Sequence, residues 1–234
     1  MDGLFFGNVV DVHGDSGSAK TELMMNVVVN FLVFSENAKI AYFDNDVKLD
    51  VVRLGVLLKS KLRNLSNDRG TVTELLKRVI VFRCQNQIEF MASLFSLDAR
   101  IRSGEIKLLM IDSWTAFLWD NIANRSASTI NGNRLRSWFR SHLQRSKLVV
   151  FGTTNSTIKS SLKFWDRIRS CRLHLRRAKT NFVTTTTTTT THDKTTLSSP
   201  KLDHEFEAGW SECSVKSGFV AKFCVADRGI VDDI

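Results

Sequence analysis

Gly14, Lys20 and Thr21 have the types and spacing of a phosphate-binding loop. They meet the pattern G-x-x-x-x-G-K-[ST] within Val9–Thr21, but Ala19 stands where its last glycine belongs. In such loops backbone N–H groups and a helix N-terminus bind phosphates, the lysine contacts the terminal phosphates, and the hydroxyl holds Mg²⁺. A Cβ in left-handed backbone costs roughly 1–3 kcal/mol, so we expect an imperfect loop. The alternative is an accidental Gly/Ser turn between a strand and a helix.

Two acids follow other predicted strands. Asp112 ends the hydrophobic run Lys107–Asp112 in the manner of a Walker B acid, which orients a water on Mg²⁺ opposite Thr21. Asp46 follows the strand Ala38–Asp44 and is the candidate for polarising an attacking water. Its alternative role is to cap the next helix. Because aspartate is one methylene shorter than glutamate, we expect slow or absent hydrolysis.

Asn155 follows a further predicted strand. Its amide would hydrogen-bond a γ-phosphate, and the loop that follows would respond to whether that phosphate is bound. The alternative role is that of a turn residue. The candidate Mg²⁺ ligands are Thr21 and Asp112. The candidate ATP-binding residues are Gly14, Asp15, Ser16, Gly17, Ser18, Ala19, Lys20, Thr21 and Asn155.

Basic residues outnumber acidic ones, 33 against 24, and the net charge of +9 suits a polyanionic partner, although solubility alone would also explain it. The densest group lies beside Phe164 and Trp165. Cations interleaved with aromatic rings bind phosphates and stack on bases, whereas a core position for Trp165 is the alternative. The candidate nucleic-acid-binding residues are Arg167, Arg169, Arg172, Arg176, Arg177 and Lys179.

Alternating strands and helices must position these side chains. Helical spacing is expected over 22–34, 50–65, 87–101 and 133–145, and strands over 38–44, 79–84, 107–112 and 148–153. This order predicts βαβ units, and therefore an α/β fold with a mostly parallel sheet flanked by helices.

The last third of the sequence changes character. Residues 167–179 alternate apolar and basic side chains, which predicts a strand with a charged face, and 219–225 is predicted to be a final strand before an acidic tail. Thr184–Thr191 is a run of eight threonines, and we expect a disordered insertion over about 183–203. No second domain is expected.

Composition excludes several classes of protein. The four cysteines contain no C-x-x-C pair, which argues against a zinc site and for a reducing intracellular compartment. No apolar run approaches the roughly 20 residues of a membrane span, and no signal peptide is evident, so no membrane partner is expected.

The segments VVDVHGDSGSAKTE, AYFDNDVKLDVVRL, FMASLFSLDARI, LLMIDSWTAFLW and LVVFGTTNSTIK together resemble the RecA-type recombinases of eukaryotes. Within them the chain is similar to the recombinase paralogues of the X-ray-repair cross-complementing group 2 type. RLHLRR and FCVADRGIVD look like the family's late, antiparallel sheet strands. Most active recombinases have glutamate at the position of Asp46, whereas this subgroup also has aspartate.

The resemblance implies a RecA-like P-loop NTPase core spanning residues 1–234 as one domain, with ATP and Mg²⁺ as its cofactors. It also implies a nuclear role in homologous-recombination repair, within a heteromeric complex. The direct neighbour would be the D-type paralogue, with B- and C-type paralogues beyond it, and single-stranded or branched DNA would be the substrate.

Several departures from the family pattern shape the expected function. The chain begins almost at the phosphate loop, so no N-terminal DNA-binding domain is expected, and a second DNA-binding loop between Asn155 and Trp165 would be short. Ala19 and Asp46 weaken catalysis more than the fold. We therefore expect a noncatalytic or weakly ATP-binding subunit that helps to load a recombinase on single-stranded DNA. The alternatives are an active DNA-dependent ATPase and a P-loop kinase for a small metabolite.

Overall fold

The computed structural model describes residues 7–65, 70–117, 132–156, 168–177, 204–211, 220–226 and 229–232. The strands are β1 Val9–Gly14, β2 Lys39–Asp44, β3 Val79–Phe82, β4 Ile106–Asp112, β5 Val149–Asn155, β6 Cys171–Arg177, β7 His204–Ser211, β8 Val220–Ala226 and β9 Gly229–Asp232. The helices are α1 Lys20–Phe34, α2 Val51–Arg63, α3 Val72–Leu76, α4 Gln87–Ser96, α5 Asp98–Arg102 and α7 Gly132–Arg145.

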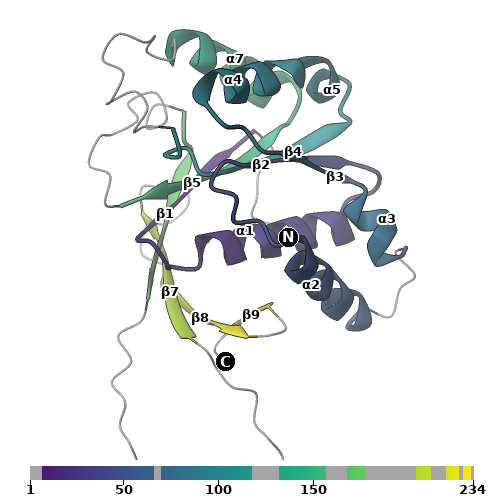
Figure 1. Cartoon of the computed structure of the whole chain (residues 1–234), viewed down its shortest axis with the longest axis vertical. Coiled ribbons are helices and arrows are strands. Elements are labelled where there is room, and N and C mark those ends of the chain that lie inside the picture. The colour runs from purple at the N-terminus through teal and green to yellow at the C-terminus, as the bar shows by residue number, and fades with distance from the viewer. Residues whose placement is uncertain are drawn as a thin grey trace, which may run out of the picture.

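The described strands form a single sheet in the order β3-β2-β4-β5-β1-β6-β7-β8-β9 (Figure 1). From β3 to β6 neighbouring strands are parallel, and from β6 to β9 they are antiparallel. The predicted α/β class is therefore confirmed, including the mostly parallel sheet and the antiparallel strands near the C-terminus. Because β1, β2, β4, β5 and β6 run in one direction, their carboxyl ends meet at one edge of the sheet.

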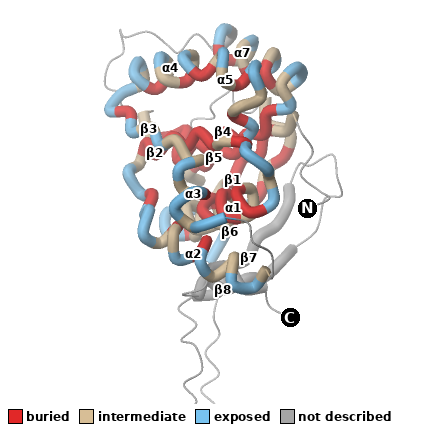
Figure 2. Tube along the Cα trace, turned by 90° about the vertical axis from the view of Figure 1, so that its right-hand side faces the viewer, coloured by how far each residue is buried: buried red, intermediate tan, exposed pale blue. Residues whose placement is uncertain are grey.

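Helices cover both faces of the parallel part of the sheet. Helices α1, α2 and α3 lie on one face, and α4, α5 and α7 lie on the other (Figure 1). Each layer buries its own apolar cluster, with Met24, Val28 and Leu58 on the first face and Phe90 and Phe139 on the second. Figure 2 shows the same arrangement, since β1, β2, β4 and β5 are largely buried while the outer sides of α2, α4 and α7 carry exposed residues. Strands buried on both faces explain the near-continuous apolar runs of the sequence.

Some predicted elements differ from the structure. The single helix expected over 87–101 is two helices, because Leu97 separates α4 from α5. Helix α3, which Thr71 and Glu74 begin with a reciprocal capping box, was not predicted. Strand β7 was not predicted either. Strand β9 lies where the residues alone predicted an acidic tail, within the segment FCVADRGIVD that resembles the family's late strands.

Other predictions fall outside the described residues. They are residues 120–131 of a loop expected over 120–133, most of the short loop between Asn155 and Trp165, and the threonine-rich insertion over about 183–203. Among the described helices, none combines the length and the apolar character that crossing a bilayer requires.

Candidate nucleotide-binding site

The loop between β1 and α1 has the backbone of a phosphate-binding loop. Gly14 has no room for a side chain, because an added Cβ would lie 2.4 Å from Leu175 O and 2.6 Å from Ser18 Oγ. Gly17 has a φ of +77° and Ala19 a φ of +61°. Ala19 therefore adopts the left-handed conformation that the glycine of the pattern would adopt, and its Cβ strains the backbone as predicted.

Helix α1 begins directly after this strained residue. Ala19 has no side-chain hydrogen bond that would cap the helix. The first N–H groups of a helix lack partners within it, and the helix dipole favours an anion there. The N-terminus of α1 is thus left to an external acceptor such as a phosphate oxygen.

Lys20 folds its ammonium group back over the loop. Its Nζ donates to Gly14 O at 2.8 Å and to Asp15 O at 2.6 Å. Burial lowers the pKa of Lys20, the ammonium of Lys48 lowers it further, and the carboxylate of Asp112 opposes the shift. The cation is held at the centre of the loop, where it would meet the terminal phosphates.

Thr21 and Asp112 meet at the carboxyl edge of the sheet. Thr21 Oγ1 donates to Asp112 Oδ2 at 2.7 Å, and Thr153 Oγ1 donates to Asp112 Oδ1 at 2.5 Å. Asp112 is only 2% exposed, and burial raises its pKa, although the hydrogen bonds from the two threonines oppose that shift. A hydroxyl and a carboxylate in contact offer the oxygen ligands that Mg²⁺ prefers.

Asp46 also lies at this edge, but its carboxylate is already engaged. Ser113 Oγ donates to Asp46 Oδ1 at 3.2 Å, and Lys48 Nζ lies 3.0 Å from Asp46 Oδ2. The alternative role of Asp46 as a helix cap is wrong, because Asp50 caps α2 by accepting from the backbone N–H groups of residues 52 and 53. Asp46 stays a candidate for polarising water, in a site that restrains it.

Asn155 lies directly beside the phosphate loop. It pairs in register with Gly14 across β5 and β1, and Ser156 N donates to Gly14 O at 3.3 Å. Ser156 Oγ also donates to the carboxylate of Asp15. The end of β5 is therefore tied to the loop on which a γ-phosphate would lie.

These residues fit a magnesium nucleotide. A Cβ at Gly14 would collide with Leu175 O and Ser18 Oγ, so the loop needs glycine there. The lysine is held inside the loop, and the hydroxyl–carboxylate pair lies beside it. Gly14–Thr21 and the start of α1 would hold the phosphates, while Thr21 and Asp112 would hold Mg²⁺. The bound triphosphate would supply the bond to be hydrolysed.

The basic cluster divides into two groups. Arg172 Nε donates to Asp11 Oδ2 at 2.6 Å, and Arg169 Nη1 lies 3.9 Å from the same oxygen. Asp11 is fully buried in β1, so these two arginines neutralise a core carboxylate. Thr154 Oγ1 donates to the other oxygen of Asp11 and also lies 2.9 Å from His13 Nδ1. His13 is accordingly a residue of β1 whose ring is engaged by a neighbouring strand.

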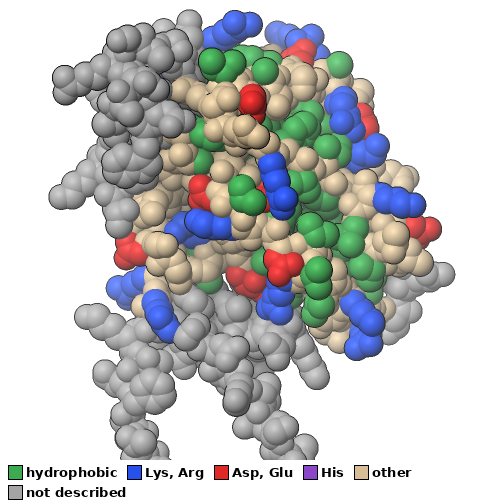
Figure 3. All heavy atoms as spheres, in the orientation of Figure 1, with side chains coloured by type: hydrophobic (Ala, Val, Ile, Leu, Met, Phe, Trp, Pro, Cys, Tyr) green, Lys and Arg blue, Asp and Glu red, His purple; other side chains and the backbone are tan. Residues whose placement is uncertain are grey.

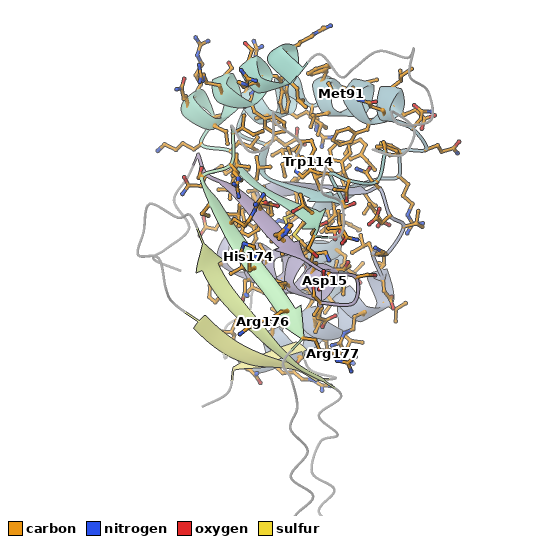
Figure 4. All side chains as sticks on the ribbon, turned by 90° about the vertical axis from the view of Figure 1, so that its left-hand side faces the viewer. Asp15, Met91, Trp114, His174, Arg176 and Arg177 are labelled. Carbon is orange, nitrogen blue, oxygen red and sulfur yellow. The ribbon has the colours of Figure 1, made fainter. Side chains whose placement is uncertain are left out.

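Arg176 and Arg177 differ from Arg172, because both are exposed at the carboxyl end of β6. Figure 4 shows His174, Arg176 and Arg177 in succession along this strand, and the pairing of Gly14 with Leu175 places Asp15 next to them. On the face drawn in Figure 3 the basic and acidic side chains are interspersed. Arg167 and Lys179 lie outside the described residues. Nucleic-acid binding by the cluster stays a prediction, with Arg176 and Arg177 as its exposed members.

Three residues of the site were not predicted from the sequence. Thr153 carried one signal, a polar residue within an apolar strand. Ser113 and Lys48 carried none beyond their closeness in sequence to Asp112 and Asp46. The contact of Ser113 with Asp46 depends on where β2 and β4 end relative to each other.

No protein-family model matches the chain. It is 27% identical over 170 residues to the DNA repair protein XRCC2 homolog of Arabidopsis thaliana, covering 55% of this chain and 46% of that protein. It is 23% identical over 116 residues to the DNA repair protein RAD51 homolog 4 of Mus musculus, covering 49% of this chain and 35% of that protein. The chain thus spans less than half the length of these curated relatives.

The crystal structure of the RadB recombinase superposes with a TM-score of 0.69 at 20% identity, covering 99% of this chain and 93% of the other. This likeness shows the RecA-like fold. The sequence resemblance to recombinase paralogues of the XRCC2 type is confirmed by the two relatives.

Proposed function

We propose that the chain is a subunit of a recombinase-paralogue complex that acts in homologous-recombination repair of double-strand breaks and stalled forks. The observation that carries the proposal is the contact between Thr21 and Asp112 beside the phosphate loop, in a chain similar to two DNA repair proteins. Its contribution would be to help load or stabilise a recombinase on single-stranded DNA.

Nucleotide binding would serve assembly more than turnover. Lys20 and the N-terminus of α1 would bind the phosphates, and Asn155 would respond to the γ-phosphate beside Gly14. The strained Ala19 and the restrained Asp46 weaken the two positions on which hydrolysis depends. ATP with Mg²⁺ would therefore order the interface with a neighbouring subunit.

The proposed partners follow from the resemblance to the paralogues. A D-type recombinase paralogue would be the direct neighbour, with B- and C-type paralogues beyond it, in the nucleus. Single-stranded or branched DNA would contact Arg176 and Arg177, the exposed members of the basic cluster.

Nucleotide affinity and turnover of the purified chain, alone and with a D-type partner, test the proposal. We expect measurable ATP affinity that rises in the presence of the partner, and turnover well below the lower end of the usual enzymatic range. A turnover of roughly 1 s⁻¹ or faster would contradict an assembly role.

An active DNA-dependent ATPase, with Lys20, Thr21, Asp46 and Asp112 all engaged, is the second candidate. The contacts of Lys20 with the loop and of Thr21 with Asp112 support it. Lys20→Ala separates the two functions in cells. Repair that survives the substitution, or that is lost together with complex assembly, supports the assembly role. Repair that is lost while the complex still assembles supports the enzyme.

A further inference from the structure

The turn between β2 and α2 is fastened to the end of β4. The backbone N–H groups of Asn45 and Asp46 donate to Asp112 O at 2.7 and 3.2 Å. Behind them, Asp44 Oδ1 accepts from Lys48 N at 2.8 Å. Val47 lies between these anchors with a φ of +53° and 65% exposure. A β-branched residue in that conformation is strained, and such strain persists where the surroundings hold it, commonly at functional sites.

The held turn places Lys48 at the rim of the nucleotide crevice. Its Nζ lies 3.0 Å from Asp46 Oδ2, and its side chain remains 56% exposed. Asp46 in turn accepts from Ser113, the neighbour of the Asp112 that contacts Thr21. Lys48 is thus separated from the expected Mg²⁺ position by a short chain of polar contacts.

Lys48 and Lys20 both lie beside the Thr21–Asp112 pair. Lys20 directly precedes Thr21 in α1, and Lys48 is linked through Asp46 to Ser113, the neighbour of Asp112. Two ammonium groups near one site both gain when an anion binds there. The terminal phosphate of a nucleoside triphosphate carries such a charge to that position, and a diphosphate lacks that group.

We infer that Lys48 is a second phosphate-binding cation that changes partner with the nucleotide, pairing with Asp46 until a terminal phosphate arrives and then binding that phosphate. The inference rests on the proposed nucleotide site and adds a residue that discriminates triphosphate from diphosphate. While Lys48 and Ser113 occupy both oxygens of Asp46, that carboxylate is not available to polarise water. When the triphosphate binds, Lys48 would move to the terminal phosphate and leave one oxygen of Asp46 free.

Titration of the full chain with ATPγS and with ADP, in the presence of Mg²⁺, tests the inference. Lys48→Met keeps the length of the side chain and removes its charge. Since a hydrogen bond to a charged group contributes about 1.5–3 kcal/mol, we expect ATPγS affinity to fall roughly ten- to hundredfold, with less than about a twofold change for ADP. Lys59→Met, at an exposed lysine of α2, is the matched control and is expected to change neither affinity.

Asp46→Asn supplies the reciprocal test. Lys48 then loses its competing carboxylate, so ATPγS affinity is expected to rise, and the rise is expected to shrink in the variant that carries both substitutions. Equal losses of ATPγS and ADP affinity in Lys48→Met, or an equal effect of Asp46→Asn with and without Lys48, would overturn this inference alone. Failure of the unaltered chain to bind either nucleotide would overturn the proposed function as well.

Discussion

Thr21 and Asp112, 91 residues apart in the sequence, form a hydrogen bond of 2.7 Å between Thr21 Oγ1 and Asp112 Oδ2. The bond joins the first turn of α1 to the end of β4. It brings together the two oxygen-bearing groups that the proposed Mg²⁺ site requires.

Thr21→Val removes the donor in this pair and keeps the shape of the side chain. The buried Asp112 then loses one of its hydrogen bonds, so we expect a loss of about 1–3 kcal/mol in the free energy of unfolding. We also expect ATP affinity to become independent of Mg²⁺. Chemical denaturation and nucleotide titration with and without Mg²⁺ measure the two effects. Thr21→Ser keeps the hydroxyl and should restore both, whereas Mg²⁺ dependence that persists in Thr21→Val would contradict the assigned role.

Asp112→Asn should stabilise the nucleotide-free protein at neutral pH. Burial raises the pKa of Asp112, so the folded state holds the proton more tightly than the unfolded state, and the ionised carboxylate costs folding free energy. We expect a higher Tm, by roughly 2–4 °C for each kcal/mol gained, together with loss of Mg²⁺-dependent nucleotide binding.

The cost of Asp112 is present above its folded pKa, and it disappears as the pH falls below the ordinary carboxyl value of about 3.9, where Asp112 is protonated in both states. The Tm difference between Asp112→Asn and the unaltered chain should therefore shrink on acidification. Thermal unfolding followed across the pH range checks the sign, and a lower Tm for the variant at neutral pH would rule the interpretation out.

Ala19→Gly should relieve the strain of the phosphate loop. An L-residue in left-handed backbone costs roughly 1–2 kcal/mol. Replacing it with glycine removes this strain, but part of the gain is offset because glycine increases the conformational entropy of the unfolded chain. With Ala19 at a φ of +61°, we expect about 0.5–1 kcal/mol of added stability and tighter nucleotide binding. Gly17→Ala, at a φ of +77°, is the opposite control and should destabilise by a similar amount. Unchanged stability in both variants would show that the loop tolerates Cβ atoms freely.

The basic residues of β6 should separate into structural and DNA-binding roles. Arg172→Ala leaves the fully buried Asp11 without its nearest cation, and breaking such a pair costs about 3–5 kcal/mol. Charge reversal at Arg176 and Arg177 should leave the Tm nearly unchanged, because both are exposed, but weaken single-stranded DNA binding and reduce its salt dependence. Thermal unfolding and DNA titration at several salt concentrations distinguish the two roles. DNA binding unaffected by the double reversal would remove Arg176 and Arg177 from the interface.

The sequence by itself determined the elements whose signals are local. Apolar runs predicted β1, β2, β4 and β5, helical spacing predicted α1 and α2, and the spacing of Gly14, Lys20 and Thr21 predicted the loop between them. The positive φ of Ala19 also followed from the sequence, because only the left-handed region fits the last glycine of the pattern.

The tertiary structure decided which side chains meet. Asp46 meets Ser113 because β2 and β4 end in register, with Asp44 beside Asp112. Arg172 neutralises Asp11 because β6 lies next to β1, an adjacency that the sequence does not predict for two residues 161 positions apart. Hydrophobic periodicity reports which face of an element is buried, whereas strand order and register choose the partner of each charged group. That choice depends on packing across the whole sheet, so the restraint on Asp46 and the division of the arginines were visible only in the fold.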